Sequence, residues 1–423
     1  MSAKEFSIEE YVSKRWKIRQ FDLPNADKYL YDLENIVMAD VGIIDALESN
    51  LFFQESCQMI ANSIYLFQRG FFDAAFYSIR QAIETSLGSL FLSANPDKMK
   101  EWKRLNHGFE LGKMASFLKE KEPVFMDMTS KMKSYFEHIR EVQKRTNKYV
   151  HKQGFLSFYS IQHYQSSDQR EERIYKRIVR DFEIALREAI GAVATYRLAI
   201  DPLPVLLMDE DIQRRSMDFI TEPYSEDFVN TYIGFEVLEA YKTTDIYQSY
   251  EKDLSAREEQ NDATYDLIHY QIIDRRKIGD IMNQMHLLSL YDRMAVVFAV
   301  VSSKIAYIIV NGWLMYVTEA DRKYQEYVMG ESYYSEFFNG ENNLNIKYRE
   351  NAFLSRVRVR NEYIYIESNE PLVEEEMKLL KETAEEFSRF MSRQESEIRD
   401  LLKENGIEYD SGKTSEVRGL EYS

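Results

Sequence analysis

The first half of the chain is organised around an amphipathic segment at residues 131–154, KMKSYFEHIREVQKRTNKYVHKQG. Apolar residues recur in it at steps of three and four, which is the spacing of one buried helical stripe. They are Met132, Phe136, Ile139, Val142, Tyr149 and Val150. Gly154 follows as a stop signal for a helix. The pattern predicts a helix at about residues 127–150 that packs by one face.

The same stretch is locally basic. It holds seven lysines and arginines against two glutamates, so its net charge is +5 in a chain whose net charge is −17. So acidic a chain is not expected to bind nucleic acid generally, and any such site must be a local basic patch. Lys144, Lys148 and Lys152 are the predicted RNA-binding residues of this patch.

Arg145 and His151 stand at the end of the stretch as Arg-x5-His, with Asn147 between them. A histidine can act as general base or acid near neutral pH. An arginine can stabilise the charge on a phosphorus under attack without a metal ion. On RNA the 2′-hydroxyl is a built-in nucleophile, so this pair is sufficient for metal-independent cleavage that leaves a 2′,3′-cyclic phosphate or its hydrolysis product.

The spacing alone does not decide for this chemistry. Arginine is frequent enough in this chain that its six histidines give about one Arg-x4-6-His pair by chance. In the alternative interpretation Arg145 is a surface residue and His151 only caps a helix. An unbroken helix would also set the two residues about 120° apart, because six residues turn by about 600°. We therefore expect the helix to end near Val150 and a second chain to complete the cleft.

Other familiar sites are absent from the sequence. It has no Gly-x4-Gly-Lys-Ser/Thr loop, no Gly-x-Gly-x-x-Gly, no His-Glu-x-x-His and no Gly-x-Ser-x-Gly. The six histidines are scattered, and the acidic run at residues 209–211 is typical of a solvated helix start. We expect no metal and no cofactor.

Two stretches together resemble a known family. The first is Gly70–Glu84, GFFDAAFYSIRQAIE, which sets Tyr77, Arg80 and Glu84 on one edge of a helix; the second is Arg145–His151. Their order and separation resemble the HEPN superfamily (higher eukaryotes and prokaryotes nucleotide-binding domain) over about residues 50–200. The family pattern is Arg-x4-6-His, often with a polar residue directly after the arginine, a position that Thr146 occupies here.

The resemblance implies a helical bundle that is often a metal-independent endoribonuclease of a bacterial toxin or phage-defence system. Arg145 and His151 would be the catalytic pair, and Asn147 an auxiliary residue. Arg80, Glu84 and Tyr149 would support them. Two roles remain open for Glu84: a surface pair with Arg80, or orientation of Arg145 across the bundle. Family members commonly pair across this helix, which implies a homodimer, and some are non-catalytic interaction or nucleotide-binding modules.

The predicted fold class is mainly α. Periodic segments predict helices at about 53–69, 71–93, 97–120, 127–150 and 170–199. Pro202 and Pro204 are taken as the end of a first domain, a HEPN-like bundle at 1–201. A mixed helical region with a small antiparallel sheet is predicted at 205–370, a long helix at 371–405 and a disordered tail at 406–423.

One apolar stretch, Met294–Val317, is long enough for a membrane span. Lys304 at its centre and the Asn311-Gly312 turn signal favour buried structure with a hairpin instead. A further strand is predicted at 353–360, where valines alternate with arginines, and a helix near 264–291.

Compartment and partners follow from simple features. The single cysteine, Cys57, indicates a reducing compartment, and the first residues show no apolar signal core. We expect a cytoplasmic protein without a membrane segment, whose partners are RNA, a second copy of the chain and a protein regulator. The second half of the chain is expected to serve as sensor, regulator or target-recognition part.

Overall fold

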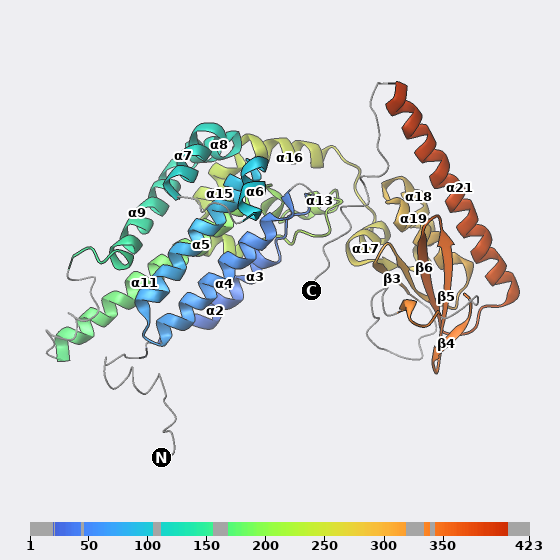
Figure 1. Ribbon diagram of the computed structural model, residues 1–423, viewed down its shortest axis with the longest axis horizontal. Helices are drawn as coiled ribbons and strands as arrows, with labels where there is room; N and C mark the ends of the chain where they lie inside the picture. The colour runs from blue at the N-terminus through green and yellow to red at the C-terminus, as the bar shows by residue number, and fades with distance from the viewer. Residues whose placement is uncertain are drawn as a thin grey trace, which may run out of the picture. The chain divides into compact units, whose positions relative to one another are not determined.

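The computed structural model describes residue 20 and residues 22–43, 46–104, 111–154, 168–318, 334–338 and 343–404. The chain divides into two compact units, Met1–Glu259 and Gln260–Ser423. It is mainly helical, and the second unit holds a small mixed sheet (Figure 1). The tail predicted at 406–423 lies outside the described residues.

Long helices form the centre of the first unit. Figure 1 shows α4 (Ser49–Gln68), α5 (Phe72–Ser93) and α11 (Asp168–Arg197) side by side. α9 (Lys133–Val150) packs against both α5 and α11. The other helices in the described part of this unit are α2 (Ala26–Asp32), α3 (Glu34–Val37), α6 (Pro96–Lys103), α7 (Leu111–Lys121), α8 (Pro123–Lys131), α12 (Leu203–Leu206), α13 (Glu210–Gln213), α14 (Glu226–Phe228), the π-helix η3 (Val229–Ile233), α15 (Phe235–Lys242) and α16 (Asp245–Ser255).

The helix predicted at 127–150 is two helices in the structure. α8 and α9 meet at Met132, whose φ of −106° and ψ of 36° interrupt the helical backbone. Met132 itself is buried, so the apolar stripe continues across the break. The break starts α9 at Lys133 and leaves its end at Val150 as predicted.

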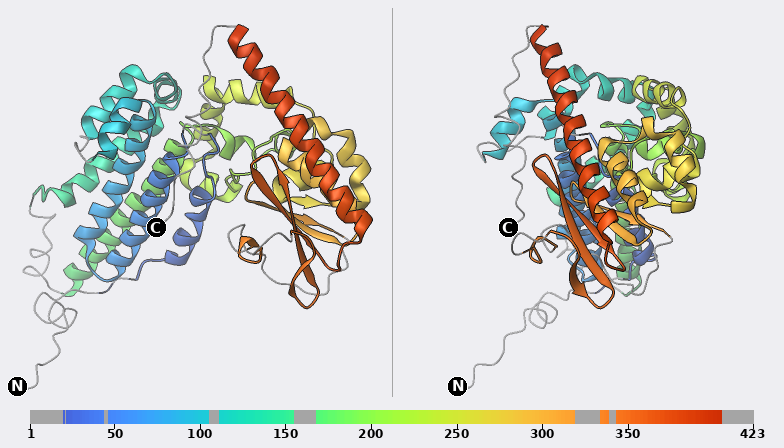
Figure 2. Two further views of the ribbon diagram at one scale, coloured as in Figure 1. Left: turned by 45° about the vertical axis from the view of Figure 1, so that its right-hand side comes forward. Right: turned by 90° about the vertical axis from the view of Figure 1, so that its right-hand side faces the viewer.

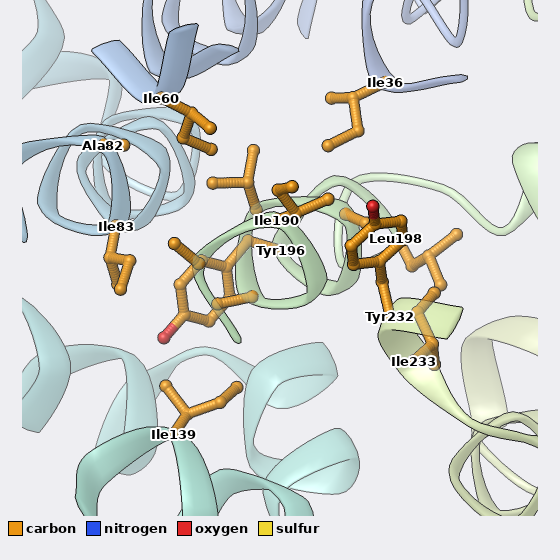
Figure 3. Packing of buried hydrophobic residues seen from close by; sticks show 14 of the residues in the cluster. Ile36, Ile60, Ala82, Ile83, Ile139, Ile190, Tyr196, Leu198, Tyr232 and Ile233 are labelled. Atoms are coloured by element: carbon orange, nitrogen blue, oxygen red, sulfur yellow. The ribbon is translucent and has the colours of Figure 1, made fainter. Parts of the chain in front are cut away.

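The core of this unit forms around α11. Ile178, Phe182 and Leu186 on its apolar face are fully buried. Figure 3 shows Tyr196 of α11 beside Ile83 of α5 and Ile139 of α9. α11 therefore holds α5 and α9 in fixed positions, and these are the two helices that carry the predicted site.

The first unit extends well beyond the prolines that were predicted to end it. Residues from Leu203 to Leu254 contribute to the same hydrophobic core. Two buried tyrosines tie them to the end of α11: Tyr224 donates to the carbonyl of Ala194 at 3.2 Å, and Tyr241 donates to that of Leu198 at 2.8 Å. The boundary lies at Glu259–Gln260, because the prolines turn the chain back onto its own bundle.

In its described residues, the second unit combines helices with a six-stranded sheet in the order β1-β3-β2-β6-β5-β4. β1 pairs with β3 in parallel, and the other four strand pairs are antiparallel. The sheet is therefore mixed, whereas an antiparallel sheet was predicted. Its elements are α17 (Asp262–Tyr270), β1 (Ile272–Ile273), η4 (Arg275–Lys277), α18 (Ile278–Asn283), η5 (Met285–Leu287), α19 (Leu290–Val301), β2 (Ile305–Val310), β3 (Trp313–Val317), β4 (Ile346–Arg349), β5 (Ala352–Val359), β6 (Glu362–Ser368) and α21 (Glu374–Glu404).

Met294–Val317, the apolar stretch that is long enough for a membrane span, forms the end of α19 and the hairpin of β2 and β3. β2 and β3 pair across Asn311 and Gly312, whose φ angles of 50° and 77° are those of a two-residue hairpin turn. Among the described residues, no helix is both long and apolar enough to cross a bilayer. The helix predicted near 264–291 is also interrupted, since Gln271 adopts a left-handed conformation and β1 follows it.

The last helix belongs to the second unit and is not a separate part of the chain. α21 packs against β5 and α19 (Figure 2). Leu380 and Ala384 are buried, and the ring of Phe387 lies 6.3 Å from that of Phe298. This part of the apolar face of α21 therefore packs within the chain.

Gly191 supplies a test of the packing around α11. A Cβ atom at this position would lie 2.2 Å from the backbone oxygen of Tyr232 in η3 and 3.1 Å from the Tyr135 hydroxyl. The Gly191→Ala variant should therefore lower the free energy of unfolding of the helical unit by about 1–3 kcal/mol, the usual range for overpacking. Urea unfolding followed by circular dichroism measures this change.

Gly88 is the matched control, because it is also buried within a long helix but has room for a methyl group. The nearest atom to an added Cβ is the Met114 sulfur at 4.0 Å. Gly88→Ala should leave stability unchanged or raise it by up to about 1 kcal/mol. Equal stability of the two variants would contradict the close approach of η3 to α11.

Candidate nucleic-acid interface and histidine site

The candidate site lies at the end of α9. The helix closes with a bond from the His151 amide to the Asn147 carbonyl at 2.8 Å and another from the Gln153 amide to the Lys148 carbonyl at 2.9 Å. Lys152 then takes a left-handed conformation, with a φ of 52°. His151 is thus the C-cap residue of α9 and stands on the exposed surface.

Tyr149 holds this end of the helix between α5 and α11. Its ring stacks on that of Phe76, with 4.3 Å between the ring centres and an angle of 2° between the planes. Its hydroxyl donates to the Asp181 carboxylate at 2.9 Å. Burial, together with the Asp181 carboxylate beside the hydroxyl, raises the pKa of Tyr149. The hydroxyl therefore stays protonated and keeps this donor role.

His151 meets an arginine that comes from a different helix. Nη1 of Arg80 in α5 lies 2.7 Å from Nε2 of His151. A guanidinium can only donate, so Nε2 is the acceptor and the neutral imidazole carries its proton on Nδ1. Nε of Arg80 is held in turn by a Glu84 carboxylate oxygen at 2.5 Å. The three side chains form one chain of contacts, Glu84–Arg80–His151.

Two roles were considered for Glu84. In the structure it pairs with Arg80, and it does not orient Arg145. The pair is only partly exposed, with side-chain exposures of 27% for Arg80 and 19% for Glu84. Tyr77 of the same helix edge approaches the Val150 carbonyl at 3.5 Å. The edge of α5 that the sequence singled out therefore faces the end of α9.

Arg145 faces the other side of α9. It lines a pocket of about 750 Å³ between α9 and α11, whereas His151 contacts α5. Among the described residues Arg145 forms no hydrogen bond, and its side chain is exposed. The predicted catalytic pair is therefore not brought together within one chain, as expected from the 120° between the two positions.

The other predicted residues have separate surroundings. Lys148 lines the pocket with Arg145. Lys144 is exposed and pairs with Glu141 at 2.7 Å, and Lys152 pairs with Asp73 of α5 at 2.5 Å. Asn147 is half-buried, and its side-chain oxygen has no hydrogen-bond partner in the part of the chain that the structure describes. Lys148 is thus the predicted RNA-binding lysine that lies in a concave site.

Two residues of the site were missed by sequence reasoning. Arg177 and Asp181 of α11 line the pocket opposite Arg145. They are four residues apart, so they lie on one face of a predicted helix. This spacing was visible in the sequence, but nothing in it showed that the face lies against α9.

Two further kinds of site were considered, a cysteine nucleophile and a metal site. Burial, with a smaller contribution from Glu34, raises the pKa of the Cys57 thiol to about 12, so Cys57 is not a ready nucleophile. The described ranges contain no group of three or more histidine, cysteine or acidic side chains that could hold a metal ion.

Comparison with protein-family models, with curated proteins and with solved structures finds no match for this chain.

The Arg80–His151 contact can be tested by the tautomer of the histidine. Long-range ¹⁵N–¹H NMR spectra at mildly alkaline pH should show His151 protonated at Nδ1, and Arg80→Ala should shift it towards the Nε2-protonated form. His138 is an internal control, because its Nε2 faces the Glu188 carboxylate at 2.8 Å and must carry a proton. An Nε2-protonated His151 in the unmodified protein would contradict the contact.

Proposed function

We propose that the helical unit is a metal-independent endoribonuclease of HEPN type that cuts RNA at the end of α9. The observation that supports this best is the chain Glu84–Arg80–His151, which places a general base beside a permanently charged guanidinium. Arg145 and Lys148 line the pocket on the other side of the same helix end, so a phosphate backbone that passes this end meets further cations.

The reaction needs only groups of the protein and the RNA. His151 Nε2 takes the proton of a 2′-hydroxyl, and the 2′-oxygen attacks the adjacent phosphorus. The bond from phosphorus to the 5′-oxygen breaks, and this oxygen takes the proton back from His151 and leaves as a 5′-hydroxyl. The other product ends in a 2′,3′-cyclic phosphate. Arg80 offsets the negative charge that builds up on the phosphate oxygens during the attack.

Substrate must first release the histidine. Without RNA, Arg80 occupies the Nε2 lone pair, so His151 cannot accept a proton. A phosphate attracts the guanidinium more strongly than a neutral imidazole does, because it carries a full negative charge and can accept two parallel hydrogen bonds. Binding of RNA is therefore the event that moves Arg80 to the phosphate and frees the base.

A second version of the same activity uses two chains. Because Arg145 and His151 face different sides of α9, a homodimer would be needed to bring Arg145 of one chain to His151 of the other. The resemblance to HEPN proteins, which commonly pair across this helix, is the support for it. In this version Arg80 positions His151, and Arg145 is the residue that stabilises the phosphate.

The alternative function is a non-catalytic RNA-binding, nucleotide-binding or interaction module. The observation in its favour is that His151 is exposed and that its Nε2 is already occupied by Arg80. On either function, we propose that the second unit acts as the regulatory or recognition part of a cytoplasmic toxin or phage-defence effector. The resemblance alone supports that role.

The activity test is cleavage of RNA in EDTA. The purified protein should cut RNA and should leave DNA of the same sequence intact, because DNA lacks the 2′-hydroxyl. His151→Ala should lower the rate about 10²–10⁴-fold, the usual contribution of general base catalysis. Arg80→Ala should lower it about 10²–10³-fold, since it removes one preorganised charge. Arg145→Ala should raise KM with a smaller effect on kcat.

Arg140→Ala is the matched control, because Arg140 is an exposed arginine of α9 that neither lines the pocket nor contacts His151. Wild-type cutting by His151→Ala, or cutting that EDTA stops, would refute the assignment. If Arg145→Ala also abolishes cutting, and mixing it with His151→Ala restores activity, the two-chain version is correct.

A further inference from the structure

The pocket between α9 and α11 has two kinds of surface. Its apolar lining comes from Phe76, Val142, Tyr149, Ile184 and Ala185. Its cationic lining comes from Arg145 and Lys148 on α9 and Arg177 on α11. The volume of about 750 Å³ falls within the usual range of about 300–1,000 Å³ for small-molecule sites. A ligand with a flat apolar part and an anionic part matches this division.

Arg177 gives independent evidence for an anionic ligand. Its Nε atom is buried, yet it has no hydrogen-bond partner among the residues that the structure describes. A buried donor without an acceptor is unfavourable, and an oxygen atom of a ligand would relieve this. A phosphate suits the position, since Arg145 and Lys148 line the same pocket.

Asp181 limits where the phosphate can sit. Its carboxylate accepts the Tyr149 hydroxyl and lies 3.5 Å from Nη2 of Arg180, so it is a negative charge in the pocket lining. A phosphate is repelled from it and attracted to the three cations. A neutral group with N–H or O–H donors, such as a base or a ribose, is instead suited to the side of Asp181.

We propose that this pocket receives one unpaired nucleotide of a single-stranded RNA, with its base and ribose on the apolar lining and its phosphate on Arg145, Lys148 and Arg177. The proposal rests on the proposed function and specifies its substrate as single-stranded. A base in a duplex is stacked and paired, so it cannot enter the pocket. Arg145 and His151 are six residues apart, about 9 Å along a helix axis, and a short strand can span both sites.

The experiment measures binding without cleavage. A fluorescent 2′-O-methyl RNA has its nucleophile blocked, so its affinity can be measured by anisotropy whether or not the protein is an enzyme. Ile184→Trp fills the pocket without a change of charge, and Arg177→Ala removes the buried donor. Each should weaken binding of the single strand about tenfold, or about 1.4 kcal/mol, because Ile184→Trp excludes the base and Arg177→Ala removes a phosphate contact.

Lys176→Ala is the charge-matched control, because Lys176 is the exposed neighbour of Arg177 and does not line the pocket. It should change the affinity less than about twofold. The same oligonucleotide in a duplex should bind more weakly than the single strand and should be insensitive to Ile184→Trp. Thermal unfolding identifies a variant that fails to fold, and the other pocket variant then decides.

Three results would overturn the proposal. The first is wild-type affinity in both Ile184→Trp and Arg177→Ala. The second is a duplex that binds as tightly as the single strand. The third is uridine or adenosine monophosphate that binds as tightly as the oligonucleotide, which would make the pocket a site for free nucleotides. Failure of the nuclease assignment is separate, because it would abolish cutting and leave these affinities unchanged.

Discussion

The stacked and hydrogen-bonded ring of Tyr149 is the contact on which the candidate site depends. It joins three helices at one point: Phe76 of α5 lies against its face, and Asp181 of α11 accepts its hydroxyl. The last turn of α9 would otherwise be a fraying helix end with exposed charges. Because the ring is fixed, the positions of the residues on either side of it in the sequence are fixed as well.

Those neighbours point to two different sites. His151 follows Tyr149 and reaches α5, where Arg80 and Glu84 form a short polar chain with it. Arg145 and Lys148 precede Tyr149 and reach the pocket along α11. One helix end thus offers a base with an adjacent charge on one side and a cationic pocket with an apolar lining on the other. Phosphates and bases alternate regularly along a strand of RNA. One strand can therefore place a base in the pocket and a phosphate beside His151, so the two sites are considered together.

The sequence predicted the parts of the fold that depend on local patterns. Periodicity located α5 to within a residue or two, and Asn311-Gly312 located the hairpin, because these signals arise within a few neighbouring residues. It did not predict that residues 205–259 complete the first core, since buried tyrosines and not sequence composition join them to α11. The contact of Arg80 with His151 spans 71 residues. The resemblance implied that Arg80 supports the site, but only the packing of α5 against α9 shows that it contacts His151.

The most direct test of the account is the chemistry of the ends that the protein leaves on RNA. Attack by the 2′-hydroxyl with His151 as base must produce fragments that end in a 2′,3′-cyclic phosphate and fragments that begin with a 5′-hydroxyl. Mass spectrometry of a short defined RNA, incubated with the protein in EDTA, distinguishes these ends, and a His151→Ala preparation controls for contaminating nucleases. The account predicts cyclic phosphates with the unmodified protein alone. Fragments with 3′-hydroxyl and 5′-phosphate ends, or equal cutting by His151→Ala, would contradict it.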